Sequence, residues 1–342
     1  GNHASAGGGL YATDSAVSVP STTFEGNTAS VGGGAFVQSH LGAASLGGLG
    51  ASFTANSAVG DGGGIALFEA SASFSDAVIA GNSSGDHGGG LYALAPPLLQ
   101  LGSSGVCNNS AAFGGGISLW GGVMQSGTVC SNDASDSGGG LYLEDGASVA
   151  YTSVRENTGT DGAGAFAAGD VAFEFVVLQD NIAADDGGGI FASGAVTATG
   201  LQLVGNTASF FGGGILDGDG SELAQLSLSA NTGGGLLLRG NATLIQPSIQ
   251  GTVGGAALHV TDDAVVSVSE GFVQNNSFVG LAVGDGDVTV EDTFFSNNLG
   301  GLVGTGDAVV ALLRCTVSNN SGAALGGGIS FDGLSLDVQS SL

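Results

Sequence analysis

The chain has 342 residues, of which 30 are acidic and three are basic, so its formal net charge at pH 7 is −27. This charge excludes electrostatic binding to nucleic acid or to anionic lipid, and it favours cationic partners or metal ions. Although 68 residues are glycine, 42% of the chain is hydrophobic, which excludes a low-complexity chain and predicts a packed core.

The first residues already follow a pattern that recurs along the chain. Asn2 precedes Gly7-Gly8-Gly9 and an apolar segment, and no signal peptide, transit peptide or lipidation motif comes before it. We therefore expect the sequence to be an excerpt of a longer protein, in which other segments supply export and outer-membrane anchoring.

The recurring unit is an apolar residue, two variable residues, Asn, a short spacer, a glycine cluster and a strand-like segment. Residues 24–27 lead to the glycines at 32–34, and residues 53–56 lead to the glycines at 62–64. The later asparagines of the series are Asn82, Asn109, Asn132, Asn157, Asn181, Asn206 and Asn231. The spacing loosens near Gly254-Gly255, Asn276 and Asn298 and recovers at Asn320, which gives about 14 repeats.

A period of about 25 residues without a helical pattern predicts a solenoid built from strands. We expect an all-β fold, a right-handed parallel β-helix with about 14 rungs and three short strands per rung. Residues 1–342 are expected to form a single β-helix domain. Within it we expect regular rungs in 1–235, looser and shorter rungs in 236–320, and a final rung in 320–342.

Residues in the same phase of the repeat should stack in columns, about 4.8 Å apart. One inward column precedes the asparagines: Phe24, Phe53, Ile79, Val106, Val129, Val154, Leu178, Leu203 and Leu228. A second follows the glycines: Leu10, Ala35, Ile65, Leu91, Ile117, Leu141, Ala165, Ile190, Ile215, Leu236 and Ala256. The glycines suit a crowded corner with positive φ, and stacked asparagines can bond to one another.

The segments Phe24-Glu25-Gly26-Asn27 and Phe53-Thr54-Ala55-Asn56, each followed by a glycine cluster and an apolar residue, carry a family resemblance. They resemble the FxxN and GGA(I/L/V) repeats of the polymorphic outer-membrane proteins, known from chlamydiae and from free-living bacteria. The resemblance covers nearly the whole chain, although most rungs have Ile, Val or Leu in place of Phe. It implies a β-helical passenger at the bacterial cell surface, often exported as an autotransporter and often adhesive.

Acidic residues gather in the spacer between the Asn and the glycine cluster. They are Asp61, Asp86, Asp136, Asp161, Asp185 and Asp186. Stacked carboxylates repel one another unless a cation lies between them, and oxygen ligands suit calcium. This edge is therefore either a calcium site or a solvated acidic edge. Residues 217–222 begin like a calcium loop but lack its later ligands, so we expect an acidic turn there.

Two cysteines share a phase of the repeat. Cys107 and Cys130 each lie two residues before an aligned Asn, so they should face outward on adjacent rungs. Stacked Cα atoms at about 4.8 Å fall within the range of roughly 4.4–6.8 Å for disulfides. The pair is therefore either a disulfide or two exposed thiols, whereas Cys315 lies at an inward phase and should be buried.

An aromatic residue often occupies the second position after the glycine cluster, which should point outward. The residues are Tyr11, Phe36, Tyr92, Tyr142, Phe166 and Phe191. Such a stripe could contact a second copy of the chain or a glycan. The alternatives are that a loop covers the stripe, or that these side chains face inward.

Chemistry on anionic polysaccharides is disfavoured because the three arginines are scattered and lysine is absent. A hydrolase would need paired carboxylates, for which Asp185-Asp186 and Asp262-Asp263 are candidates.

We expect a non-enzymatic extracellular structural or adhesive β-solenoid that binds a cell-surface glycan or protein, or assembles with itself into a fibre or layer. The alternative is a β-helix that binds or hydrolyses a polysaccharide. Calcium is the candidate cofactor.

Overall fold

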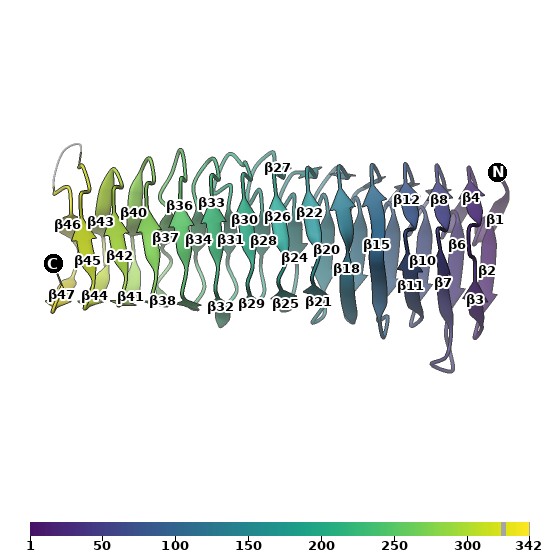
Figure 1. Ribbon diagram of the computed structural model, residues 1–342, viewed down its shortest axis with the longest axis horizontal. Coiled ribbons are helices and arrows are strands. Elements are labelled where there is room, and N and C mark those ends of the chain that lie inside the picture. The colour runs from purple at the N-terminus through teal and green to yellow at the C-terminus, as the bar shows by residue number, and fades with distance from the viewer. Residues whose placement is uncertain (323–325, 342) are drawn as a thin grey trace.

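The chain winds into a ladder of short strands in which each turn lies on the one before it. The computed structural model describes residues 1–322 and 326–341, and Figure 1 shows the turns side by side along one axis from the N-terminus to the C-terminus. These residues form strands, turns and bends, and successive turns pair in parallel. The predicted all-β, β-helical fold is confirmed. No helix in the described ranges is long and apolar enough to cross a membrane.

Three sheets follow the axis: sheet A with eight strands, sheet B with 14 and sheet C with 25. Each turn adds one strand to sheet B, so its 14 strands span about 13 complete turns. The strands of sheet A are β1 (His3–Ala6), β5 (Thr28–Val31), β9 (Ser57–Ala58), β13 (Ser83–Ser84), β16 (Ser110–Ala111), β19 (Asp133–Ala134), β23 (Thr158–Gly159) and β27 (Ile182–Ala183). Those of sheet B are β2 (Leu10–Thr13), β6 (Ala35–Gln38), β10 (Ile65–Phe68), β14 (Leu91–Leu94), β17 (Ile117–Trp120), β20 (Leu141–Glu144), β24 (Ala165–Ala167), β28 (Ile190–Ala192), β31 (Gly214–Leu216), β34 (Leu236–Leu238), β37 (Leu258–Val260), β40 (Val279–Val283), β43 (Gly300–Thr305) and β46 (Ile329–Asp332).

Sheet C receives two segments from most turns, and β15 (Leu99–Cys107) and β18 (Val123–Cys130) each run through both. The first segments are β3 (Ala16–Ser18), β7 (Ser45–Leu49), β11 (Ser71–Ser75), β21 (Ser148–Ala150), β25 (Val171–Glu174), β29 (Val196–Thr199), β32 (Ser221–Ala224), β35 (Ala242–Ile245), β38 (Ala264–Ser269), β41 (Gly286–Glu291), β44 (Val309–Leu313) and β47 (Ser335–Gln339). The second segments are β4 (Thr23–Glu25), β8 (Ser52–Thr54), β12 (Val78–Ala80), β22 (Ser153–Arg155), β26 (Val177–Gln179), β30 (Gln202–Val204), β33 (Ser227–Ser229), β36 (Ser248–Gln250), β39 (Phe272–Gln274), β42 (Phe294–Ser296) and β45 (Thr316–Ser318). Most of the turns that contribute a strand to sheet A therefore have four strands. The later turns, which add no strand to sheet A, have three.

The inward columns form one continuous core. Phe24 pairs with Phe53, and Phe53 with Ile79, in the parallel register that the repeat predicts. Phe53 and Ile79 are fully buried. A single cluster of buried apolar residues extends from Val19 to Cys315, so every turn is stabilised by the apolar surface that it buries against its neighbours.

The corner between sheets A and B requires glycine because neighbouring turns leave no space for a side chain. Gly32 has φ of +66°, a value that favours glycine. A Cβ atom on Gly34 would lie 2.6 Å from the carbonyl oxygen of Gly64 and 3.0 Å from the side-chain nitrogen of Asn56. The glycine cluster therefore allows the chain to turn the corner against the next turn.

Two residues, Ile215 and Ala256, were assigned wrongly to the second inward column. Phe211, with φ of +46°, takes the position that the first glycine occupies in earlier turns. The register consequently places Gly214 beside Ile190 in the inward column, and Ile215 lies beside Phe191 on the outer face. In the turn after Leu236, Leu258 takes the inward position instead of Ala256.

Candidate functional site

The outer face of sheet B carries a continuous row of aromatic side chains, which we call the aromatic ribbon. It consists of Tyr11, Phe36, Phe68, Tyr92, Trp120, Tyr142, Phe166 and Phe191. The ring centroids of Tyr11 and Phe36 are 5.3 Å apart, and those of Phe166 and Phe191 are also 5.3 Å apart. Both pairs are nearly parallel, with interplanar angles of 3° and 2°. In these two pairs the ring faces contact one another along the axis, whereas Phe68, Tyr92 and Trp120 meet their neighbours in tilted or edge-on contacts.

This stacking decides how much of the predicted stripe is accessible. Tyr11 is 57% exposed, but Phe36 and Tyr92 are only 8% and 5% exposed. Tyr142, Phe166 and Phe191 are half-buried. The six residues share one outward column, but neighbouring rings cover most of it. Of the predicted stripe, Tyr11 is thus widely exposed, Tyr142, Phe166 and Phe191 are partly exposed, and Phe36 and Tyr92 are buried.

Two members of the aromatic ribbon were missed by the sequence analysis. Phe68 and Trp120 lie two residues after Ala66 and Ser118, the small residues that occupy the stripe position in those turns. The ring of Phe68 lies 5.1 Å from Phe36 and 5.5 Å from Tyr92, so it bridges the gap over Ala66. The sequence pattern that could have revealed these two residues is a small residue at the stripe position followed two positions later by an aromatic residue.

A charged cluster adjoins the middle of the aromatic ribbon, and we call Asp61, Asp86 and His87 the His87 corner. The Nδ1 atom of His87 lies 3.1 Å from Oδ1 of Asp86 and 3.3 Å from Oδ1 of Asp61. The imidazole ring stacks on Phe113 with centroids 5.1 Å apart, and it meets Trp120 edge-on at 5.4 Å. His87 directly precedes the glycine cluster, so the corner between sheets A and B positions it beside both carboxylates.

Burial and nearby charges act in opposite directions on the ionisation of this cluster. Burial lowers the pKa of His87, but the hydrogen bond to Asp61 and the charges of Asp86, Asp61 and Glu144 outweigh it, so the pKa lies above its ordinary value. Burial, followed by the charges of the same three carboxylates, raises the pKa of Tyr92 to about 12. The outer face of sheet B is therefore negatively charged around a half-buried imidazole.

The six predicted aspartates do not form one column. Asp61, Asp161 and Asp186 directly precede the first glycine, whereas Asp86, Asp136 and Asp185 lie one residue earlier. In the described part of the chain, only the His87 corner brings three His, Cys, Asp or Glu ligand atoms within 4.8 Å of one another. Asp161 instead accepts a hydrogen bond from the backbone N–H of Asp186 at 3.1 Å.

The two aspartates of the acidic turn at residues 217–222 have protein partners. Asp217 lies 3.3 Å from Arg239, and Asp219 accepts a hydrogen bond from the backbone N–H of Asn241 at 2.8 Å. Asp262 of the candidate hydrolase pair also faces Arg239, at 3.5 Å. These aspartates serve local structure in the turns where they lie.

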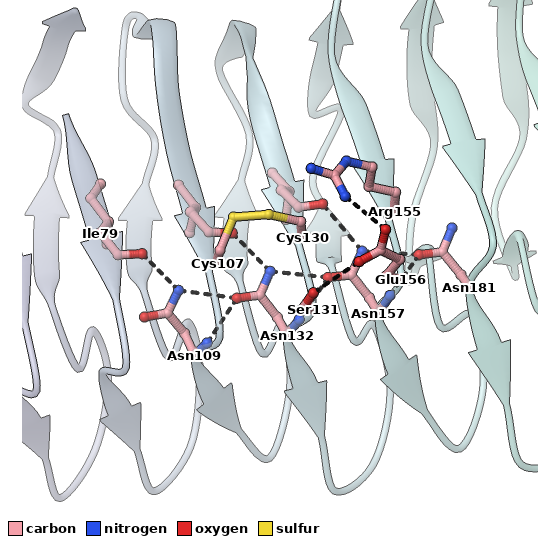
Figure 2. The surroundings of a disulfide bond; sticks show 12 residues. Ile79, Cys107, Asn109, Cys130, Ser131, Asn132, Arg155, Glu156, Asn157 and Asn181 are labelled. Carbon is pink, nitrogen blue, oxygen red and sulfur yellow. Dashed lines mark hydrogen bonds and ion pairs between the residues drawn. A yellow bond between two sulfur atoms is a disulfide. The ribbon is translucent and has the colours of Figure 1, made fainter. Parts of the chain in front are cut away.

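A disulfide links two adjacent turns on sheet C, as Figure 2 shows. It joins Cys107 at the end of β15 to Cys130 at the end of β18, with Cα atoms 4.6 Å apart. Cys315 is a free cysteine and is 2% exposed. Disulfides persist in oxidising compartments, so this bond is compatible with an extracellular location.

Beside the disulfide, the side chains of successive asparagines form a ladder (Figure 2). Nδ2 of Asn109 donates to Oδ1 of Asn132 and to the carbonyl oxygen of Ile79, both at 3.0 Å. Oδ1 of Asn109 accepts from the backbone N–H and from Nδ2 of Asn82. Each inner amide of this ladder is thereby satisfied in the core.

Sheet C presents further surface features that the sequence analysis missed. Tyr151 and Phe175, in the bends between the two segments of sheet C, stack with centroids 5.7 Å apart, and Phe272 and Phe294, on its strands, stack at 5.3 Å. These four rings are 46–55% exposed. A nearby groove of about 480 Å³ is lined by Ser221, Glu222, Asn241, Thr243, Ser267 and Thr289, among others. The alternation of inward and outward residues along a strand could have indicated that Phe272 and Phe294 face outward, since each precedes an inward residue.

Stacked parallel turns, inward apolar columns and an asparagine ladder define a β-solenoid repeat protein. Residues 21–37 match the Chlamydia polymorphic membrane protein repeat, so a repeat of this family lies in the segment from β4 to β6. The resemblance noted at residues 24–27 is confirmed there. The chain has no match among the curated proteins or the solved structures. The repeat and the fold fit the passenger of a cell-surface protein.

Proposed function

We propose that the chain is a non-enzymatic passenger segment of a bacterial surface protein and that it serves adhesion. The observation that carries this proposal is a polymorphic membrane protein repeat at residues 21–37 within a solenoid whose core is continuous from Val19 to Cys315. A continuous core makes a stiff rod, which can hold a binding surface away from a membrane. The net charge of −27 favours solubility of the rod, and it favours partners that are cationic or neutral.

The adhesive surface in this proposal is the pair of exposed aromatic stacks on sheet C. Phe272 and Phe294 are 48% and 46% exposed, and Tyr151 and Phe175 are 55% and 49% exposed. In the aromatic ribbon the rings cover one another, whereas these rings remain accessible to a partner. Exposed aromatic side chains are the groups that most often anchor protein and glycan contacts. The partner is a glycan or protein of another cell surface.

Adhesion can be tested by displaying the chain on a non-adherent bacterium through a heterologous outer-membrane anchor. We expect the displaying cells to bind one or more immobilised glycans or surface proteins, and the double variant F272S/F294S to bind at least about tenfold less. The control is V78S, because Val78 is 49% exposed in the same column of sheet C but is not aromatic. Equal binding by the anchor alone would contradict the proposal.

Self-assembly is a separate outcome of the same proposal, and it is tested on the soluble chain. Sedimentation at rising protein concentration measures whether copies associate. If the parent chain associates and the F272S/F294S variant does not, the aromatic stacks form the contacts between copies. A monomer that still supports adhesion would assign them to a foreign partner.

The groove on sheet C favours polysaccharide binding as a second candidate function. Its lining combines the exposed carboxylate of Glu222, the amide of Asn241 and the hydroxyls of Thr243, Ser267 and Thr289 with the apolar side chain of Val265. These polar groups suit hydrogen bonds to the hydroxyls of a neutral sugar chain. Neutral oligosaccharides incubated with the chain should bind without release of reducing ends, and E222Q should weaken binding. Release of reducing ends that E222Q or D185N abolishes would instead support hydrolysis.

A further inference from the structure

We propose that the His87 corner binds a divalent transition-metal ion, for which Zn²⁺ is the reference, through the carboxylates of Asp61 and Asp86 and Nδ1 of His87. The ligands come from two adjacent turns, so the ion would tie one turn to the next. This site is independent of the adhesive surface on sheet C.

The distances between the three side chains fit a metal centre. Two ligand atoms at about 2.1 Å from one zinc ion lie roughly 3.0–3.4 Å apart when the bond angle is between about 90° and 109°. Nδ1 of His87 lies 3.1 Å from the oxygen of Asp86 and 3.3 Å from that of Asp61. All three ligand atoms lie within 4.8 Å of one another, so movement of the two carboxylates would place them around one ion.

The donor set selects the kind of metal. Calcium prefers oxygen ligands only, whereas one imidazole nitrogen with two carboxylates is a set that zinc and neighbouring transition metals accept. The oxygen-only edge considered from the sequence is thus replaced here by a mixed nitrogen and oxygen site. Three protein ligands leave coordination positions for water or for a donor atom of a partner.

The charge balance of the chain is compatible with a cation at this position, because the arginines are engaged elsewhere. The chain has three arginines and no lysine, and each arginine pairs with a carboxylate elsewhere. The pairs are Arg155 with Glu156, Arg239 with Asp217 and Asp262, and Arg314 with Glu291 and Asp292. Among the described residues, the Asp61 and Asp86 carboxylates have an imidazole as their only basic partner.

The surroundings hold the imidazole in place and leave an entry path. The ring of His87 stacks on Phe113 and contacts Trp120 and Tyr142, with centroids 5.1, 5.4 and 5.6 Å away. The side chain of His87 is 17% exposed and that of Asp61 is 26% exposed, whereas Asp86 is 56% exposed. Aromatic rings therefore cover one side of the site, and the side of Asp86 is open to solvent.

Trp120 provides a direct readout because it is the only tryptophan of the chain and touches His87. The untagged chain, freed of metal with a chelator, is titrated with Zn²⁺ by calorimetry and with Co²⁺ by fluorescence and visible absorption. We expect one Zn²⁺ per chain, saturable quenching of Trp120 by Co²⁺, and displacement of Co²⁺ by Zn²⁺ but not by Ca²⁺.

Variants locate the bound ion. H87Q and D86N should each weaken Zn²⁺ binding at least about tenfold, as expected for the loss of a ligand. D86N changes an exposed side chain, so it keeps the test valid if H87Q folds poorly. The controls are D161N, in the same corner of a later turn, and H40Q, which removes the exposed His40 beside Asp14. Absence of saturable binding, binding that H40Q alone abolishes, or displacement by Ca²⁺ would overturn the proposal.

Discussion

Among single residues, the asparagine ladder shows how a polar side chain can be fully satisfied inside an apolar solenoid. Each inner amide uses two donors and two acceptors, as Asn109 does with its neighbours in the turns before and after it. Thr252 interrupts the series. Its backbone N–H still donates to Asn276 at 3.0 Å, but its hydroxyl oxygen is the one buried side-chain polar atom of the described residues without a partner.

We predict that T252N stabilises the protein. The new amide would accept from Asn231 and donate to Asn276, so it would connect the two halves of the ladder and remove an unsatisfied hydroxyl. An unsatisfied buried polar group costs about 1–3 kcal/mol, so the free energy of unfolding should rise by about 1–2 kcal/mol. Urea denaturation measures it. The T252S variant keeps the hydroxyl and should gain nothing, and equal effects of the two variants would contradict the explanation.

Within the elements, the sequence predicts positions that depend on spacing alone. The inward column from Phe24 to Leu228 is found in register because each repeat keeps the same spacing between its apolar residue and its Asn. Ile215 was misplaced because Phe211 adopts a left-handed conformation that large residues seldom take. A bulky residue at a glycine position shifts the alignment by one residue, and sequence patterns give no warning of it.

The candidate sites were harder to predict because they depend on side-chain contacts across turns. Asp61 and Asp86 were expected at an acidic edge, but His87 was not connected with them, since alignment of acids alone ignores the imidazole that lies between them. The burial of Tyr92 depends on Phe68 and Trp120, which lie at a different position of the repeat. Spacing indicates that these residues face outward, but it does not indicate which ring covers which.

We predict that the aromatic ribbon stabilises sheet B as well as covering it. Phe166 stacks between Tyr142 and Phe191, so F166A should lower the free energy of unfolding by about 2 kcal/mol. Among the described residues Tyr11 stacks on one ring, that of Phe36, and it is 57% exposed, so Y11A should cost less than about 1 kcal/mol. Thermal unfolding of both variants provides the comparison. A larger loss for Y11A would show that ring stacking does not determine stability here.

The disulfide should stabilise the two turns that it joins. It closes a loop with a sequence separation of 23 residues, for which chain entropy predicts about 3 kcal/mol. We therefore expect C107S/C130S to unfold at lower urea concentration and to lose its response to reductant. The control C315A leaves the disulfide in place, so reductant should destabilise it as it does the parent chain. An unchanged midpoint in C107S/C130S would contradict the prediction.

Across the whole molecule, 30 acidic residues in stacked turns repel one another, and the repulsion is concentrated where carboxylates are partly buried. Burial raises the pKa of Asp161, and although the Asp186 backbone N–H opposes this, the charges of Asp185 and Asp136 add to the increase. Burial also raises the pKa of Asp186, together with the charges of Asp185 and Asp161. Exposed Asp292 behaves oppositely, because its hydrogen bond to Arg314 lowers its pKa.

These directions predict that Asp161 and Asp186 favour the folded state more in mild acid than at neutral pH. A carboxyl whose pKa is raised by folding binds its proton more tightly in the folded state, so its contribution is complete below the pKa of the unfolded chain, about 3.9. That contribution is lost as the pH rises through the folded pKa. The contribution of these two carboxyls to the unfolding midpoint in urea should therefore increase as the pH is lowered from 7 towards about 4.5. The D161N/D186N variant should be more stable at pH 7 and depend less on pH. D287N/D307N removes the same number of charges at exposed positions, so a matching response in that variant would assign the effect to net charge instead of to the corner aspartates.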